Sequence, residues 1–290
     1  MFAHANSLAQ HFTKPIIISY RKENGTCDSS IGTFVVINEE GWFVTANHII
    51  DLISNLSKSL NDHKALLQKR TEIESNDQLK KHVKIQELKR HSIPAHAITH
   101  VSVLPFWMYA HLTNIRVLPE ADLAIGQISG FKPEMVEIYP QFKDCTKPML
   151  AGTSLCKLGF PFHHIAPVFQ ETKFVLPPGS MPPPLFPIDG IYTRTVEMPP
   201  VQGIPISLIE TSTPGLKGQS GGPTFDVHGS IWAIQSRTMH HPLGFGDNND
   251  TTRKAEFLKN QYLNVGLGVH ALTITSFLQK NGVTFHTSPT

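Results

Sequence analysis

Short apolar runs alternate with turn residues over most of the chain, and this pattern limits the fold more than any other feature. From Ile31 to Ile50 the sequence reads IGTFVVINEEGWFVTANHII, two β-branched and aromatic runs separated by Glu39, Glu40 and Gly41. Gly41 suits the positive φ that a tight hairpin turn requires. Similar runs follow at 121–128, 153–160, 206–212, 230–236 and 264–274. Many short strands separated by turns predict a mostly β protein of the barrel type.

Residues 51–91 differ from the rest, because they are rich in Leu, Lys, Glu and Gln and contain no Pro, Gly or aromatic residue. This composition predicts a helical insert. Residues 58–90 hold nine Lys or Arg against five Asp or Glu. Binding of single-stranded nucleic acid would favour aromatic residues among the basic ones, and none is present. We interpret the segment as a solvated helix, and nucleic-acid binding is disfavoured.

Prolines crowd the stretch between the runs at 153–160 and 206–212. They include Pro177, Pro178, Pro182, Pro183, Pro184 and Pro187. Because proline has no N–H group, it cannot donate to the hydrogen-bond ladder of a sheet. Residues 161–205 are therefore predicted to form a long surface loop between strands.

The composition excludes several classes of protein. The chain has 290 residues, 40% of them hydrophobic, and a formal net charge of +2, which rules out a disordered tail, a collagen-like fibre and a disulfide-rich miniprotein. Cys27, Cys145 and Cys156 lie far apart, so reduced thiols are expected. Met1 to Lys14 does not read as a signal peptide, and no apolar stretch reaches the length of a membrane span. A cytoplasmic location without a membrane partner is expected.

The segment Lys217-Gly218-Gln219-Ser220-Gly221-Gly222-Pro223 places a serine among glycines, directly before an apolar run. Acyl transfer needs an exposed hydroxyl beside backbone N–H groups that are free to bind an oxyanion. Glycines allow the sharp turn that directs such groups outward. Ser220 is the candidate nucleophile, and the N–H groups of Gly218 and Ser220 are the candidate oxyanion hole.

A serine nucleophile needs a base, and the base needs a carboxylate. His48 follows the apolar run that ends at Ala46, and Asp122 precedes the run Leu123-Ala124-Ile125. Asp51 is a rival acid, but it lies three residues after His48 in the same helical turn and could hardly reach behind the ring. Asp226 fits a hairpin turn better. His48, Asp122 and Ser220 are the predicted catalytic residues.

These residues carry a family resemblance. TANHI, ADLAI and GQSGGP, in the order His, Asp, Ser, resemble the three signature blocks of the trypsin-like (chymotrypsin-fold) serine peptidases. Further stretches are similar to the bacterial Deg/HtrA-type intracellular branch: CKLGFPF at 156–162, LIETSTPGLKGQSGGPTFDVHGSIWAIQS at 208–236 and VGLGVHALTITSFLQ at 265–279. Ten residues follow Lys280 in this sequence, and no PDZ domain is expected.

The resemblance implies one peptidase domain of two six-stranded antiparallel β-barrels with the active site in the cleft between them. The first barrel would span 15–135 with the helical insert, and the second 145–282 with the Pro-rich loop and a short C-terminal helix. Residues 51–91 lengthen the spacing between His48 and Asp122 beyond the family's usual value. We therefore expect the insert to emerge beside the cleft, where it would gate access or dock a regulatory protein.

The resemblance also bears on regulation and specificity. Gln219 stands where the digestive enzymes carry an aspartate, so activation by a new N-terminus is disfavoured. The segment 212–217 holds no carboxylate, which disfavours cleavage after Arg or Lys. A small, apolar or neutral polar side chain before the cut is expected. The predicted substrate-binding residues are Pro214, Gln235, Ser236, Thr238 and His270.

The sequence predicts a serine endopeptidase that acts on protein or peptide substrates through an acyl-enzyme and needs no cofactor. The pairs His163-His164 and His240-His241 lack a metal-binding spacing, and no metal site is predicted. Two alternatives stay open. One is a latent protease of the same fold that a partner activates, and the other is a non-catalytic binding module that uses the basic insert.

Overall fold

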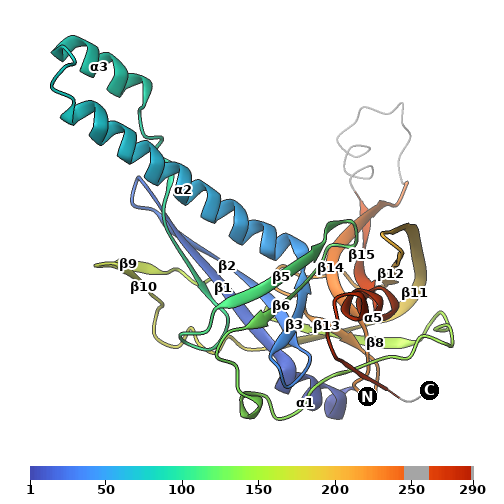
Figure 1. Cartoon of the computed structure of the whole chain (residues 1–290). Coiled ribbons are helices and arrows are strands. Elements are labelled where there is room, and N and C mark those ends of the chain that lie inside the picture. The colour runs from blue at the N-terminus through green and yellow to red at the C-terminus, as the bar shows by residue number, and fades with distance from the viewer. Residues whose placement is uncertain (245–260, 289–290) are drawn as a thin grey trace.

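The first half of the chain forms a curled sheet of six antiparallel strands, in the order β4-β1-β2-β3-β6-β5 (Figure 1). The computed structural model describes residues 1–244 and 261–288. The strands are β1 (Thr13–Lys22), β2 (Cys27–Val36), β3 (Trp42–Ala46), β4 (Ile98–Leu104), β5 (Leu112–Leu118) and β6 (Leu123–Ile128). All five residues of β3 are buried, as their apolar sequence predicts. The hairpin between β2 and β3 is confirmed, and Gly41 has a φ of +75°.

The second half contains a closed ring of six strands. They are β8 (Ser154–Gly159), β11 (Phe186–Val201), β12 (Ile204–Thr211), β13 (Pro223–Phe225), β14 (Ile231–Pro242) and β15 (Tyr262–His270). The ring closes because β13 pairs with both β8 and β14. In the first sheet, by contrast, β4 and β5 remain unpaired ends within the described part of the chain. The expected mostly β architecture of two six-stranded units is confirmed.

Small elements complete the two halves. Two short strands, β7 (Gln141–Phe142) and β16 (His286–Thr287), extend the second sheet beyond β14 through parallel pairing. The 3-10 turns η1 (Pro119–Ala121) and η2 (Pro133–Met135) flank β6. One hydrophobic core cluster draws residues from both sheets, including Phe34, Ile125, Leu158 and Phe225. The proposed boundaries at 15–135 and 145–282 stay a prediction.

The helical insert forms an arm that projects from the first sheet (Figure 1). It consists of α2 (Asn47–Ser75) and the shorter α3 (Lys81–Arg90). The helical prediction for 51–91 is therefore right in kind, but α2 starts four residues earlier and the helix breaks at 76–80. The arm is anchored where α2 packs against β4 and where His63 Nε2 lies 3.1 Å from Glu23 Oε2.

The Pro-rich segment is only partly a loop, which corrects the prediction for 161–205. It contains the hairpin of β9 (Val168–Gln170) and β10 (Lys173–Val175), and β11 begins inside it at Phe186. Pro187 is tolerated in β11 because that strand pairs only with β8 at this point; its pairing with β12 begins at Tyr192. A proline whose missing N–H faces an unpaired edge removes no ladder bond.

Two terminal helices cover the second sheet. The expected C-terminal helix is present as α5 (Ala271–Lys280). The N-terminal helix α1 (Ala3–Phe12) was not expected; it buries Ala5, Ala9 and Phe12, and neighbouring Phe2 packs edge-on against Phe225. Within residues 1–244 and 261–288, no helix combines the length and apolarity needed to cross a bilayer.

Candidate active site

Strand register brings His48 and Asp122 together from positions 74 residues apart. Ala46 at the end of β3 pairs with Leu123 at the start of β6. His48 follows β3 and Asp122 precedes β6, so both residues lie at the same end of these two paired strands. The imidazole Nδ1 lies 2.9 Å from Asp122 Oδ2 and 3.1 Å from Oδ1. The backbone N–H of His48 donates to Asp122 Oδ1 at 2.9 Å, which fixes the carboxylate from a second direction.

The Asp122 carboxylate is held in its charged form. Its side chain is 14% exposed, and Ser236 Oγ donates to Oδ2 at 2.6 Å. Burial alone raises the pKa of Asp122, but hydrogen bonds from His48 and Ser236 outweigh that effect and the pKa lies below its usual value. An ionised carboxylate on Nδ1 keeps the proton on that nitrogen, so Nε2 is left free to accept one.

The Ser220 turn is wedged between the two sheets. The Thr33 N–H from β2 donates to the Ser220 carbonyl at 2.9 Å, and the Gly221 N–H donates to the Gln235 carbonyl at 2.8 Å. Gly221 has a φ of +82°, and a Cβ built there would lie 2.0 Å from the Thr33 carbonyl oxygen. Only glycine fits this close approach. The glycines around Ser220 are thus required by contact with the first sheet as well as by the turn.

The two predicted oxyanion donors are free. Gly218 has a φ of +96°, and its carbonyl accepts from Thr33 Oγ1 at 2.7 Å and from the Phe160 N–H at 3.1 Å. With its carbonyl held on that side, the N–H groups of Gly218 and Ser220 have no hydrogen-bond acceptor among the described residues. Two neighbouring free N–H groups beside a hydroxyl can bind a developing negative charge.

Ser236 links the acid to the serine. Its hydroxyl contacts Asp122, as above, while Ser220 Oγ lies 3.4 Å from its carbonyl oxygen. No hydrogen bond joins Ser220 to His48 among these residues, and the imidazole is 49% exposed. Catalytic hydrogen bonds are often long before substrate binds. Sequence reasoning assigned Ser236 to the substrate strand and missed its contact with Asp122, because only the folded register reveals it.

Three of the other predicted substrate-binding residues gather at segment 212–217. Thr238 Oγ1 donates to the Gly215 carbonyl at 2.6 Å. Gln235 is buried, and its Nε2 donates to the Arg237 and Leu267 carbonyls. A Cβ on Gly215 would lie 2.2 Å from that Nε2, so the segment packs directly on Gln235. The Pro214 carbonyl accepts from Lys157 Nζ at 2.9 Å.

His270 lies elsewhere. It pairs with Ala233, three residues before Ser236 in β14. Its Nδ1 accepts the Leu272 N–H at 3.1 Å and caps α5, and its ring packs against Trp232. The structure therefore engages His270 at the start of α5 and not with the cluster around segment 212–217. Asp226, as predicted, serves a hairpin turn: its carboxylate accepts from His228 N, Ser230 N and Trp232 Nε1.

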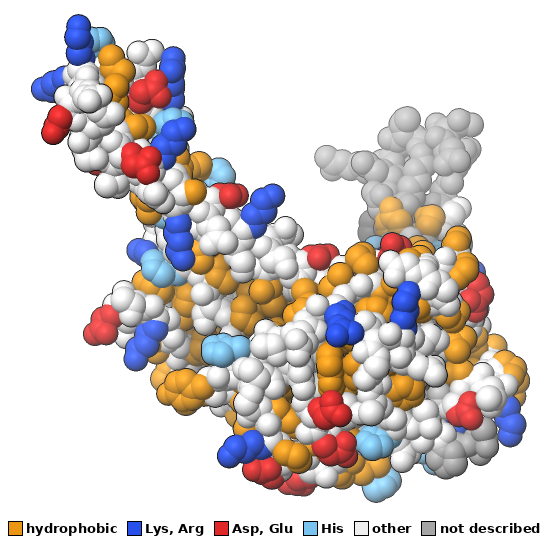
Figure 2. Space-filling view, in the orientation of Figure 1, with side chains coloured by type: hydrophobic (Ala, Val, Ile, Leu, Met, Phe, Trp, Pro, Cys, Tyr) orange, Lys and Arg blue, Asp and Glu red, His pale blue; other side chains and the backbone are white. Residues whose placement is uncertain are grey.

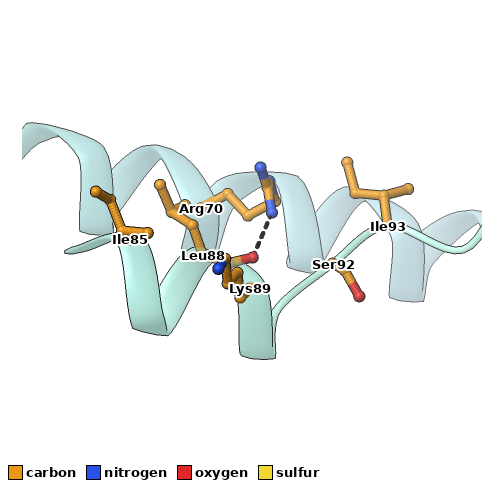
Figure 3. Close-up of a pocket in the computed structure, with 6 residues that line it drawn as sticks. All are labelled: Arg70, Ile85, Leu88, Lys89, Ser92 and Ile93. Atoms are coloured by element: carbon orange, nitrogen blue, oxygen red, sulfur yellow. Dashed lines mark hydrogen bonds between the residues drawn. The ribbon is translucent and has the colours of Figure 1, made fainter. Parts of the chain in front are cut away.

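The arm begins at the candidate base, since His48 is the second residue of α2. Figure 2 shows basic and acidic side chains interspersed along the arm. Toward its tip, the Arg70 guanidinium donates to the Leu88 carbonyl at 2.9 Å (Figure 3). It also donates to the His91 carbonyl at 2.8 Å, and together these bonds hold α3 against α2. Ile85, Leu88 and Ile93 line a shallow cavity between the two helices. No group of metal-binding side chains occurs within the described ranges.

The architecture and the placement of these residues agree with one known fold. A curled six-stranded sheet and a closed six-stranded barrel meet at the Ser220 turn, with His48 and Asp122 on the first and Ser220 on the second. The fold is a chymotrypsin-like double β-barrel. This confirms the expected fold class, two six-stranded antiparallel units with helices in the first half and at the C-terminus.

Comparisons with known proteins give remote matches. No protein-family model matches the chain, and no curated protein matches it. Among solved structures, the active form of the Rv3671c protease from M. tuberculosis is 14% identical, with 99% of this chain and 87% of that chain covered and a TM-score of 0.46. The HtrA-type protease AlgW with a tripeptide is 15% identical, with coverage of 98% and 65% and a TM-score of 0.46. The AlgW structure with a decapeptide is 13% identical, with 97% of this chain and 68% of that chain covered and a TM-score of 0.49.

Proposed function

We propose that this protein is a serine endopeptidase. The proposal rests on one observation above the others: Ser236 touches Asp122 with its hydroxyl and lies 3.4 Å from Ser220 Oγ with its carbonyl. Ser236 therefore lies between the Asp122–His48 pair of the first sheet and Ser220 of the second. A proton acceptor, a hydroxyl and two free N–H groups at one point are the groups that acyl transfer requires.

In this mechanism Ser220 Oγ attacks the carbonyl carbon of a peptide bond while His48 Nε2 takes the hydroxyl proton. The oxyanion forms against the N–H groups of Gly218 and Ser220. Asp122 holds the imidazole in the reactive tautomer and stabilises its charged form. His48 then protonates the leaving amine, and an acyl-enzyme on Ser220 remains. Water attacks the ester with His48 again as base, which releases the second product and restores the hydroxyl.

The test is covalent labelling of the purified protein by a fluorophosphonate probe, read by intact mass. We expect one adduct on the wild type and none on Ser220→Ala or His48→Ala. Ser7→Ala on the exposed face of α1 is the matched control and should label like the wild type. Circular dichroism establishes that each variant is folded. A folded wild type that takes no adduct, or a Ser220→Ala variant that still takes one, would overturn the proposal.

The latent form of this protease would have a different nucleophile turn. Latency by a disordered or misdirected oxyanion loop requires Gly218 or Ser220 N–H to be absent from the site or occupied. Here both are free, and the turn is held by Thr33. We therefore propose that the oxyanion hole is formed without a partner and that the protein acts on protein or peptide substrates.

We also propose a role for the arm in binding a regulatory protein or gating access, because α2 leads directly from His48. A variant in which a Gly-Ser linker replaces residues 56–90 tests this. Reduced cleavage of a folded protein substrate, with an unchanged labelling rate for the small probe, is the expected result. Unchanged cleavage and unchanged binding of proteins from the native cell would rule the role out.

A further inference from the structure

Lys157 is a buried lysine that the proposed mechanism does not use. It lies in β8 and is 1% exposed. Its ammonium donates to three oxygens: Thr211 Oγ1 at 3.2 Å, the Thr213 carbonyl at 2.5 Å and the Pro214 carbonyl at 2.9 Å. No carboxylate of the described residues lies within ion-pair distance of Nζ. Burying a cation among neutral groups carries a desolvation cost, so its place here calls for a reason other than fold stability.

All three acceptors belong to the segment that enters the nucleophile turn. β12 ends at Thr211, and no strand supports residues 212–219. On the far side of the turn, Thr224 in β13 pairs with the backbone of Lys157 itself. One residue therefore holds both flanks of Ser220, the preceding segment through its ammonium and the following strand through its backbone.

The rest of β8 serves the same turn. A Cβ on Gly159 would lie 2.7 Å from the Gln219 Cα, and a Cβ on Gly222 would lie 2.1 Å from the Leu158 carbonyl. Gln219 is fully buried, and its Oε1 accepts the Leu216 N–H at 3.0 Å. This amide is neutral and cannot pair with an ammonium. The cation beside this turn is Lys157 of β8, which donates to two backbone carbonyls and one threonine hydroxyl.

The space around Nζ is tight. A Cβ on Gly266 of β15 would lie 2.8 Å from Nζ. Burial lowers the pKa of Lys157 to about 8, so the ammonium form still predominates at neutral pH. A methionine would fill the same volume without the cost of desolvating a charge. The lysine is thus poorly explained as a filler of the core.

We propose that Lys157 is a positioning residue for the nucleophile turn: its ammonium fixes Thr211, Thr213 and Pro214 and thereby keeps the N–H groups of Gly218 and Ser220 directed into the site. This inference rests on the proposed function for its catalytic consequence. Its structural consequence, the ordering of residues 212–219, does not depend on activity. The two consequences are measured separately.

The catalytic test compares Lys157→Met with the wild type in the second-order rate of fluorophosphonate labelling. Loss of one oxyanion donor in a hydrolase lowers the rate by about 10²-fold or more, and we expect a decrease of that order. Leu155→Ala is the control, since Leu155 is buried in the same strand but belongs to a separate hydrophobic cluster that includes Ile209 and Trp232 and no residue of 212–219. It should lose thermal stability and keep its labelling rate. Equal rates for Lys157→Met and the wild type would refute the proposal.

The structural test is hydrogen–deuterium exchange of peptides that cover residues 212–222. We expect exchange in Lys157→Met to be at least about tenfold faster there and unchanged in the first sheet. This readout works even if the wild type proves unreactive, so failure of the proposed function and failure of the positioning role give different results. Unchanged exchange at 212–222 in Lys157→Met would refute the positioning role.

A pH profile separates positioning by charge from packing. The neighbouring titratable groups are Cys156 on β8, Asp189 on β11 and Glu210 on β12. Burial raises the pKa of the Cys156 thiol to about 11, and Glu210 is paired with Arg194 and His241, so neither changes charge near pH 8. We expect the labelling rate of the wild type to fall as pH rises through about 8, and Lys157→Met to lack this decline. A decline of equal size in both would refute the role of the charge.

Discussion

Asp122→Asn is the substitution that most directly tests the geometry of the site. The wild-type carboxylate accepts the His48 N–H and Nδ1–H and the Ser236 hydroxyl proton. An asparagine whose oxygen keeps the bond to the His48 N–H must turn its NH₂ toward Nδ1. Nδ1 then becomes the acceptor, so the proton moves to Nε2. In that tautomer His48 cannot take the proton of Ser220.

The magnitude follows from this change of tautomer. In a catalytic triad, an Asp-to-Asn change that keeps the geometry lowers the rate by about 10⁴-fold. At 1.36 kcal/mol for each factor of ten, that is about 5 kcal/mol of transition-state stabilisation. Ser236→Ala leaves the charge and the tautomer intact and removes one hydrogen bond to a charged group, worth about 1.5–3 kcal/mol. We expect it to lower the rate by about 10- to 150-fold.

The assay is the second-order rate of fluorophosphonate labelling at pH 8, measured for the wild type and both variants. The expected order is wild type, then Ser236→Ala, then Asp122→Asn. If Asp122→Asn reacts as fast as Ser236→Ala, the carboxylate does not set the tautomer of His48, and the reasoning fails. Thermal melting curves establish whether each variant keeps its fold.

Three further predictions concern the frame of the site. Burial lowers the pKa of Lys157 from the ordinary 10.5 to about 8, so the unfolded chain binds more protons than the folded chain between these pH values. The free energy of unfolding should therefore rise with pH across that window, and Lys157→Met should lack the rise. Urea unfolding at several pH values checks this. Gly221→Ala should destabilise the fold by more than about 3 kcal/mol, since its Cβ would meet the Thr33 carbonyl, and a melting curve close to that of the wild type would contradict it. Arg70→Met should release α3 and open residues 76–91 to limited proteolysis while labelling of Ser220 stays unchanged; protection equal to the wild type would show that Arg70 does not hold α3.

The sequence was most informative where one local pattern decides the structure. The runs Trp42–Ala46 and Leu123–Ile128 are mostly apolar, and all but one of their residues are buried. The Gly-rich turn was predictable because clustered glycines suit positions where the backbone turns sharply or takes a positive φ. Since β3 and β6 pair, placing His48 and Asp122 at their ends was sufficient to bring the two side chains together.

Other features depend on partners that no local pattern specifies. Pro187 lies in a strand because the β12 pairing starts beyond it, a fact of register and not of composition. The contact of Ser236 with Asp122 joins residues 114 positions apart. His270 was expected near segment 212–217, but its imidazole accepts the Leu272 N–H and caps α5. No sequence pattern indicates that Lys157 is buried, since a lysine in a strand usually points to solvent.

The contacts of Thr33 have a consequence for when the site comes into being. Thr33 Oγ1 and the Gly218 carbonyl are 185 residues apart in the chain, and closing so long a loop makes this one of the slowest contacts to form. During synthesis the N-terminal sheet emerges first and carries the imidazole and the carboxylate without a serine to activate. The Ser220 turn takes its shape only once the second barrel has folded and docked on β2. Under the proposed function, a chain whose second barrel has not yet folded is therefore inert toward its neighbours, and proteolytic competence reports that the two barrels have docked.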